Sequence, residues 1–311
     1  MTQTHFQALG SWIQGHLQLP TLAWQPLSGD AGGRSYFRLL NAPEPLLAVH
    51  CSNPAKELLD FDRLGLALAG AGVPVPRPLA LDAERGFMLI PDYGDRLLSS
   101  LTADERLPWY RQAMGLLPKI RAVQAELPRA DLAFVTRKRQ LFEDWYLARH
   151  LGVTVPQTLL QPLFERLYDN FFSQPQVPSH RDYHGRNLLC HGDELVVIDF
   201  QDLLLAPLTY DAASLLRDSY VSLSTAEEQA LIAQAFAEQA FTDDEALFKR
   251  WLDLTAMLRQ LKILGIFCRL HYQDGKSRYL DSLAPTRDKL LETARRYPEF
   301  ADFADWLEAN A

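Results

Sequence analysis

Apolar residues in the first third of the chain fall in short runs that alternate with turn-forming residues. Three such runs, at 36–40, 46–51 and 86–90, are separated by Gly, Pro, Asn and Asp. This spacing is typical of the strands of an antiparallel sheet. The pattern changes near residue 93, beyond which helical periodicity dominates.

Helical patterns are recognised by apolar residues recurring every three or four positions. Phe6, Leu9, Ile13 and Leu17 lie on one face of a predicted helix, and a second helix is expected to begin near Pro54. Beyond residue 93 the helical patterns occupy three segments within 104–172, broken at 127–134 and 151–156, and then 207–222, 225–240, 243–272 and 285–297. The chain is therefore expected to fold as an α+β protein, with a sheet-rich N-terminal part and a helical C-terminal part.

A charged segment interrupts the helical patterns. The stretch "SHRDYHGRNLL" (179–189) is too rich in Gly, His and Arg to be core, and it leads into "LLCHGDELVVID". That second stretch contains two apolar runs joined by a Gly-Asp turn, which predicts a β-hairpin. The hairpin ends on Asp199.

Composition restricts the class of partner. The 311 residues are 48% hydrophobic and 23% charged, which is typical of a globular chain. The formal net charge of −8 disfavours a nucleic-acid binder, which needs clustered Lys and Arg to meet phosphates. A small molecule is the expected partner, and the protein is expected to be a monomer.

The cysteines and the N-terminal segment bear on the compartment. Cys51, Cys190 and Cys268 are far apart and lack metal-ligand spacing, so neither a disulfide framework nor a zinc site is expected. No apolar run approaches the ~20 residues of a membrane-spanning helix, and the N-terminus lacks the features of a signal peptide. A cytoplasmic location without membrane contact is predicted.

The charged segment and the hairpin together supply the groups that phosphoryl transfer requires. Asp182 is followed five positions later by Asn187, and the hairpin then delivers Asp199. In such a site one carboxylate accepts the proton of the attacking hydroxyl, while an Asn and a second Asp hold Mg²⁺ on the nucleotide phosphates. Residues 180–187 match the protein-kinase pattern H-R-D-x-x-x-x-N, although Gln201 stands where that family has a Gly after its metal-binding Asp.

Other interpretations of the same residues are weaker. An isolated Asp before a helix is most often a cap, but the Asn and the apolar strand that follow favour catalysis for Asp182. His180 and His184 have the spacing of a zinc pair, yet the glutamate of an H-E-x-x-H motif is missing, so His180 is expected to orient the loop. Asp193, in "HGD", is read as a turn residue because Ile198, five positions later, cannot bind metal.

Several stretches resemble one branch of the kinase-like fold. "HRDYHGRNLL", "VIDFQD" and "GD…YF" are similar to the aminoglycoside phosphotransferase and choline kinase family, which phosphorylates small-molecule hydroxyls. Within it, "IDFQDLLLAPLTYDAASLLRDSY" (198–220) most resembles the bacterial kinases that phosphorylate N-acetylmuramate and N-acetylglucosamine at C1 in cell-wall sugar recycling. The resemblance covers nearly the whole chain. It implies two lobes, a nucleotide-binding one at 1–93 and a catalytic, acceptor-binding one at 94–311, with ATP and Mg²⁺ in the cleft.

The resemblance also implies roles for individual residues. Asp182 would be the catalytic base, and Asn187 and Asp199 the Mg²⁺ ligands. Asp202 and Asp211 would support the site, although structural roles are as plausible for both, and Glu57 would be the family's ion-pair glutamate. The backbone of "IPDYG", with Asp92 and Tyr93, would pair with adenine.

The loop over the phosphates is expected within "LSGDAGGRSYFRLL" (27–40). Gly29, Gly32 and Gly33 would let backbone N–H groups approach the oxyanions, with Arg34 beside them, although a plain hairpin turn is an alternative. The resemblance implies a lysine for the phosphates on the strand at 46–51, yet His50 stands at that place in "LLAVH". Arg34, Arg38 and Lys56 are the candidates to replace its charge.

Three functions remain open at this point. The favoured one is a sugar 1-kinase, the rival enzyme is a kinase of an aminoglycoside or choline-like amine, and the third is a nucleotide-sensing pseudokinase. The complete set of Asp182, Asn187 and Asp199 disfavours the pseudokinase. The identity of the acceptor is not decided by the sequence.

Overall fold

The computed structural model describes residues 3–27, 33–52 and 54–311, which form two compact units. The chain passes between the units more than once. Unit 1 comprises Met1–Leu101, Ala122–Ala125 and Arg186–Asp202, and unit 2 comprises Thr102–Arg121, Glu126–Gly185 and Leu203–Ala311. The assignment of separate nucleotide and acceptor lobes at 1–93 and 94–311 stays a prediction.

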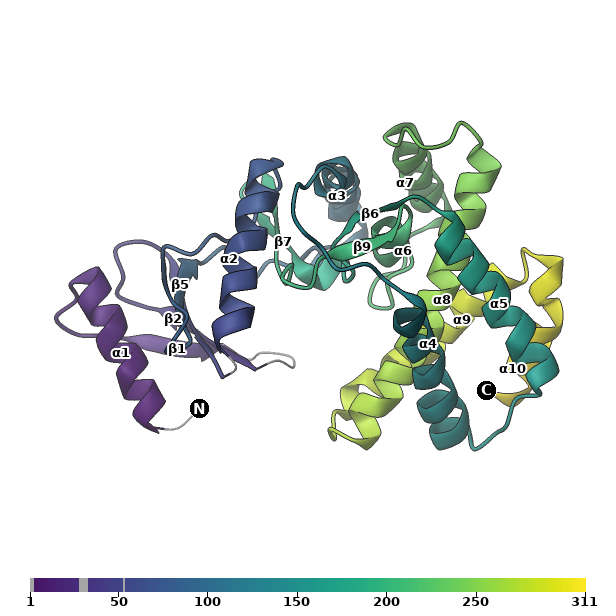
Figure 1. Ribbon diagram of the computed structural model, residues 1–311, viewed down its shortest axis with the longest axis horizontal. Helices are drawn as coiled ribbons and strands as arrows, with labels where there is room; N and C mark the ends of the chain where they lie inside the picture. Colours follow the sequence, from purple (N-terminus) through teal and green to yellow (C-terminus); the bar gives the residue numbers. More distant parts are fainter. Residues whose placement is uncertain (1–2, 28–32, 53) are drawn as a thin grey trace. The chain divides into compact units, whose positions relative to one another are not determined.

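Unit 1 is built on a five-stranded antiparallel sheet with the order β1-β2-β3-β5-β4. Helix α1 (Gln3–Leu17) and helix α2 (Pro54–Gly70) lie on opposite sides of this sheet (Figure 1). Apolar residues of α1 and of the facing strands form one core, which includes Leu9, Ile13 and Ala48. The strands are β1 (Trp24–Leu27), β2 (Arg34–Leu39), β3 (Leu46–Cys51), β4 (Ala80–Asp82) and β5 (Phe87–Pro91).

The three strands expected from the apolar runs are confirmed as β2, β3 and β5. The sequence did not predict β1 and β4, which are the two edge strands of the sheet. Both are short, and β1 contains Pro26, which an edge strand tolerates because its N–H side need not pair. Strands this short contain few apolar residues, so the apolar pattern of the sequence does not reveal β1 and β4.

The expected hairpin is also confirmed and belongs to unit 1. Strand β7 (Leu188–His191) pairs with β8 (Glu194–Val197), and Gly192 in the turn has a positive φ of 54°. The Cys190 N–H donates to the Arg96 carbonyl at 2.7 Å, and the Val197 N–H donates to the Pro74 carbonyl at 2.8 Å. These bonds fix the hairpin to the rest of unit 1.

Unit 2 is organised around one long helix, α8 (Glu245–Tyr272), against which several other helices pack (Figure 1). A Cβ at Gly265 would lie 2.1 Å from the Leu141 carbonyl oxygen, so only glycine lets α8 approach this closely. The other α-helices of unit 2 and its π-helix η2 are α3 (Ala103–Arg121), α4 (Leu132–Leu141), η2 (Phe142–Leu151), α5 (Gln157–Ser173), α6 (Tyr210–Leu216), α7 (Thr225–Ala237), α9 (Leu283–Ala294) and α10 (Ala301–Asn310).

Some helix predictions for unit 2 are wrong in extent. The helix expected over 207–222 is confined to α6, because strand β9 (Leu204–Pro207) precedes it and pairs with β6 (Gln176–Ser179). The break expected at 127–134 ends earlier, since the Asp131 side chain caps α4 by accepting from the Phe134 N–H at 2.8 Å. Within the described part of the chain, no helix is long and apolar enough to span a membrane.

Candidate active site

The segment 180–185 lies in unit 2 and is held by two carboxylates that follow β9. The buried Asp211 accepts the backbone N–H groups of His180 at 2.6 Å and of Arg181 at 3.0 Å. Asp218 accepts the N–H of Gly185 at 3.1 Å. Burial raises the pKa of Asp211, but the His180 charge and the two amide donors act in the opposite direction. Both ends of the segment are therefore anchored.

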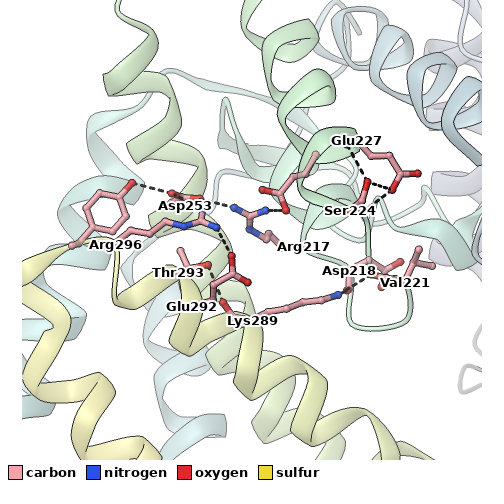
Figure 2. Close-up of polar contacts among 12 residues, drawn as sticks. Arg217, Asp218, Val221, Ser224, Glu227, Asp253, Lys289, Glu292, Thr293 and Arg296 are labelled. Carbon is pink, nitrogen blue, oxygen red and sulfur yellow. Dashed lines mark hydrogen bonds and ion pairs between the residues drawn. The ribbon is translucent and has the colours of Figure 1, made fainter. Parts of the chain in front are cut away.

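Asp218 is itself fixed by a polar network (Figure 2). Lys289 on α9 donates to the carbonyl of Asp218 and, at 2.8 Å, to that of Val221. The Asp218 carboxylate also accepts the N–H of Tyr220 at 2.9 Å. The chain after α6 is thus bound to α9 on one side and to Gly185 on the other.

Asp182 lies between these anchors and faces cations. Its side chain is 35% exposed, and the Lys262 Nζ on α8 lies 3.6 Å from its Oδ1. Burial raises the pKa of Asp182, but the charges of Lys262 and Arg259 outweigh it and hold the net pKa well below the ordinary value. Arg181, which precedes it, has a φ of 77°, a strained conformation of the kind that gathers at functional sites. Asp182 is therefore an ionised, positioned carboxylate.

Asn187 and Asp199 are brought together in unit 1 by the hairpin register. Leu188 pairs with Val197, and the Ile198 N–H donates to the Asn187 carbonyl at 3.0 Å, so Asn187 and Asp199 flank the open end of the hairpin. The Asp199 side chain is 48% exposed, and its backbone has a φ of 62°. The hairpin thus brings Asn187 and Asp199 near each other along the backbone, and each residue carries a hard oxygen donor.

Arg34 at the start of β2 contacts Asp199. Its guanidinium donates to the Asp199 Oδ1 at 3.2 Å and to the Gln201 Oε1 at 3.1 Å, and the Gln201 Nε2 donates to the same Asp199 oxygen at 2.8 Å. Gln201, which stands where the kinase pattern has a Gly, thus hydrogen-bonds to both Arg34 and Asp199. Of the three residues proposed to replace the charge of the missing lysine, Arg34 is the one that contacts Asp199.

Arg38 and Lys56 lie elsewhere in unit 1. Arg38 pairs with Asp92 and Asp95, and Lys56 is exposed on α2. Its two carboxylate partners raise the pKa of Arg38. Neither side chain is therefore placed with Arg34.

The assignment of His50 to the lysine position is wrong. His50 stacks on His5 of α1, with ring centroids 5.3 Å apart, whereas the next residue, Cys51, donates its thiol hydrogen to the Glu57 Oε2 on α2 at 3.2 Å. Side chains alternate across a strand, so a one-residue shift exchanges the two faces of the sheet. Cys51 stands opposite Glu57, where a strand lysine would pair with its glutamate.

Arg34 lies beside this position. The register places it directly across from Cys51. Burial raises the pKa of Tyr36, on which the charges of Arg34, Asp199 and Glu57 also act. The cation near Asp199 is thus supplied from β2 instead of β3.

Part of the expected phosphate loop lies outside the described residues. This applies to Gly29 and Gly32. Gly33 is described, and its carbonyl accepts the N–H and the hydroxyl of Ser52, each at 2.8 Å. A Cβ at Gly33 would lie 3.0 Å from the Ser52 Oγ, which fits a position that favours glycine.

The expected adenine-pairing segment is partly committed to the sheet. The Asp92 N–H donates to the Pro45 carbonyl at 2.9 Å, and its carboxylate binds Arg38 and the Gly94 N–H. The Tyr93 carbonyl lies 3.2 Å from the His191 Nδ1. Asp92 thus holds the segment in shape, and its N–H is already paired.

Nearly the whole chain matches proteins that transfer phosphoryl groups. The model of the phosphotransferase enzyme family matches residues 23–249, which include Asp182, Asn187 and Asp199. The chain belongs to this family. A relative from Pseudomonas aeruginosa, an N-acetylmuramate/N-acetylglucosamine kinase, is 35% identical over 97% of this chain and 96% of its own.

Solved structures of low identity confirm the fold of this phosphotransferase. An aminoglycoside 2'-phosphotransferase-IIIa in complex with GDP has a TM-score of 0.67 at 15% identity, covering 96% of this chain and 100% of that one. A choline/ethanolamine kinase family protein from Mesorhizobium loti has a TM-score of 0.62 at 16% identity, covering 97% and 99%. The expected two-part, kinase-like α+β fold is confirmed.

Several residues of the candidate site were not predicted from the sequence. Arg259 and Lys262 lie in the apolar run of α8, and two cations among so many buried residues were a usable signal. Asp218 and Gln201 gave no signal, because their contacts depend on distant parts of the chain. Asp202 is exposed, and its role stays a prediction.

Proposed function

We propose that this phosphotransferase moves the γ-phosphoryl group of ATP to the C1 hydroxyl of N-acetylmuramate or N-acetylglucosamine. The observation that carries the proposal is the identity of 35% over nearly the full length with a kinase of these two sugars. The residue types support it, since Asp182 is a carboxylate beside Lys262, and Asn187 and Asp199 flank the β7–β8 hairpin, as phosphoryl transfer would require of a base and of metal ligands. Action in the cytoplasm as a monomer remains part of the proposal.

Asp182 would orient the acceptor. Its carboxylate accepts the hydrogen bond of the C1 hydroxyl and then its proton, as the new O–P bond forms and the bond to ADP breaks. Lys262 and Arg259 keep the pKa of Asp182 low, so it is a weak base. An anomeric hydroxyl is more acidic than an ordinary alcohol, and a weak base suffices for it.

Asn187 and Asp199 are the residues that would hold Mg²⁺. The amide oxygen of Asn187 and the carboxylate of Asp199 suit this ion. Mg²⁺ usually has only a few protein ligands, and waters and phosphate oxygens complete its coordination. Among the described residues no group of three or more His, Cys, Asp and Glu side chains is arranged to hold a metal ion. When bound, Mg²⁺ neutralises charge on the phosphates.

Arg34 would supply the cation that other kinases take from a strand lysine. We expect Arg34→Met to lower kcat/KM for ATP by about 10²-fold, the cost of removing a group that stabilises phosphate charge. His50→Ala is the matched control, because His50 lies on the opposite face of the sheet, and it should change kcat/KM by less than about threefold. Steady-state kinetics with varied ATP measure both. The opposite order of effects would show that the phosphates lie elsewhere.

The proposed reaction is tested by following ADP release with a panel of acceptors. The panel contains N-acetylmuramate, N-acetylglucosamine, choline and kanamycin, each with ATP and Mg²⁺. We expect turnover of one or both amino sugars and none of the two amines. Brisk turnover of kanamycin or choline without turnover of either sugar would replace the proposal with the rival kinase.

A further inference from the structure

Cations outnumber carboxylates around Asp182. The Lys262 Nζ lies 3.6 Å from its Oδ1, and the charges of Arg259 and Arg181 also act on it. The nearby Asp211 does not balance them, because its carboxylate is buried and binds two backbone amides. The group that would receive the acceptor hydroxyl is thus surrounded by an excess of positive charge.

The structure explains Arg259 as structural, and also Lys138, whose charge acts together with those of Arg259 and Lys262 on Tyr210. Arg259 is 4% exposed and donates to the Arg181 carbonyl at 2.6 Å and to the Ser214 hydroxyl. Lys138, also 4% exposed, donates to the Tyr210 hydroxyl at 2.9 Å and lies 4.1 Å from the centre of the Phe134 ring. These two cations are committed to the core of unit 2.

Lys262 differs from both. Its side chain is 15% exposed, and its 3.6 Å contact with Asp182 is an ion pair beyond hydrogen-bond distance. Within the described ranges, no acceptor lies within hydrogen-bond distance of its Nζ. An ammonium group carries three donors, so Lys262 can bind a further anion while it faces Asp182.

The positive charge around Asp182 affects which acceptors can bind. A polycation such as an aminoglycoside would be repelled, whereas an anionic acceptor would be attracted and oriented. N-acetylmuramate carries a carboxylate on an ether at C3, two ring bonds from C1, whereas N-acetylglucosamine is neutral. With C1 at Asp182, that carboxylate would lie near the side chains that surround Asp182, of which Lys262 is 3.6 Å away.

We propose that Lys262 binds the acceptor's carboxylate and makes this enzyme prefer the acidic amino sugar over the neutral one. The inference rests on the proposed function. Lys262 would be a specificity-determining residue, acting on one substrate and not on the other. A charge-assisted hydrogen bond of this kind corresponds to about 10- to 100-fold in kcat/KM.

The test combines one substitution in the enzyme with one chemical change in the substrate. The kcat/KM of wild type and of Lys262→Met is measured with N-acetylmuramate and with its carboxamide, which keeps the shape and removes the charge. We expect the wild type to prefer the acid by about 10- to 100-fold and Lys262→Met to show a ratio near one. Lys249→Met, which removes an exposed lysine on the same helix, should keep the wild-type ratio.

Each other outcome overturns the inference in a distinguishable way. A wild-type ratio near one means that the carboxylate is not recognised, even if both sugars are good substrates. An unchanged ratio in Lys262→Met, with both substrates slowed alike, assigns Lys262 to the transferred phosphoryl group. Absence of turnover with acid, amide and N-acetylglucosamine overturns the proposed function and this inference together. If circular dichroism shows that Lys262→Met is unfolded, the ratio of kcat/KM for the acid over the carboxamide is measured in Lys262→Gln instead and compared with the wild-type ratio.

Discussion

Asp182→Asn should lower kcat by about 10²- to 10⁴-fold while the affinity for ATP stays within about threefold of wild type. The amide keeps the shape of the side chain but cannot take the proton of the attacking hydroxyl. Single-turnover kinetics measure the chemical step, and calorimetric titration measures ATP binding. The matched control is Asp193→Asn, in the turn of the β7–β8 hairpin, which should retain wild-type turnover. Loss of turnover in the control instead would move the catalytic carboxylate to "HGD".

The pH dependence follows from the low pKa of Asp182. The carboxylate stays ionised as the pH falls, so protonation of Asp182 should cause no loss of kcat down to about pH 5. Lys262→Met removes one of the charges that lower this pKa, and an acid limb should then move toward neutral pH. An acid limb near pH 6 in the wild type that disappears in Asp182→Asn would contradict the assigned electrostatics.

Asp199→Asn should weaken Mg²⁺-dependent ATP binding by at least about 10²-fold, because loss of a direct ligand exceeds the 10- to 100-fold cost of losing a supporting group. The measurement is ATP affinity with and without Mg²⁺. Glu194→Gln, on the exposed start of β8, is the control and should bind like wild type. Affinity within about threefold of wild type in Asp199→Asn would place the metal elsewhere.

Arg34 provides a check on this result, because Asp199→Asn also releases its guanidinium from an ion pair. Arg34→Met should weaken ATP binding both with and without Mg²⁺, whereas Asp199→Asn should act only when the metal is present. The two variants therefore separate the cation from the metal ligand.

The sequence predicted the parts of the site that are local. Asp182, Asn187 and the β7–β8 hairpin with Asp199 lie within one short stretch, and its turn chemistry and apolar runs suffice to place Asn187 beside Asp199. The long helices and the central strands were predicted for the same reason, because their periodic patterns are strong.

The sequence predictions fail where a residue's position depends on a one-residue shift along a strand or on a contact with a distant part of the chain. His50 and Cys51 are adjacent, and only the pairing of β3 with β2 and β5 shows which of them faces α2. Arg34 meets Asp199 across more than half of the chain, and Lys262 reaches Asp182 from α8. No local pattern encodes such contacts.

The position of the phosphoryl group in the product tests the central proposal most directly. Phosphorus NMR of the product formed from N-acetylmuramate with ATP and Mg²⁺ should show one signal coupled to the C1 proton, and mild acid should hydrolyse the ester, as expected of a sugar 1-phosphate. A signal coupled to the C6 protons, from an ester stable to mild acid, would contradict the proposal.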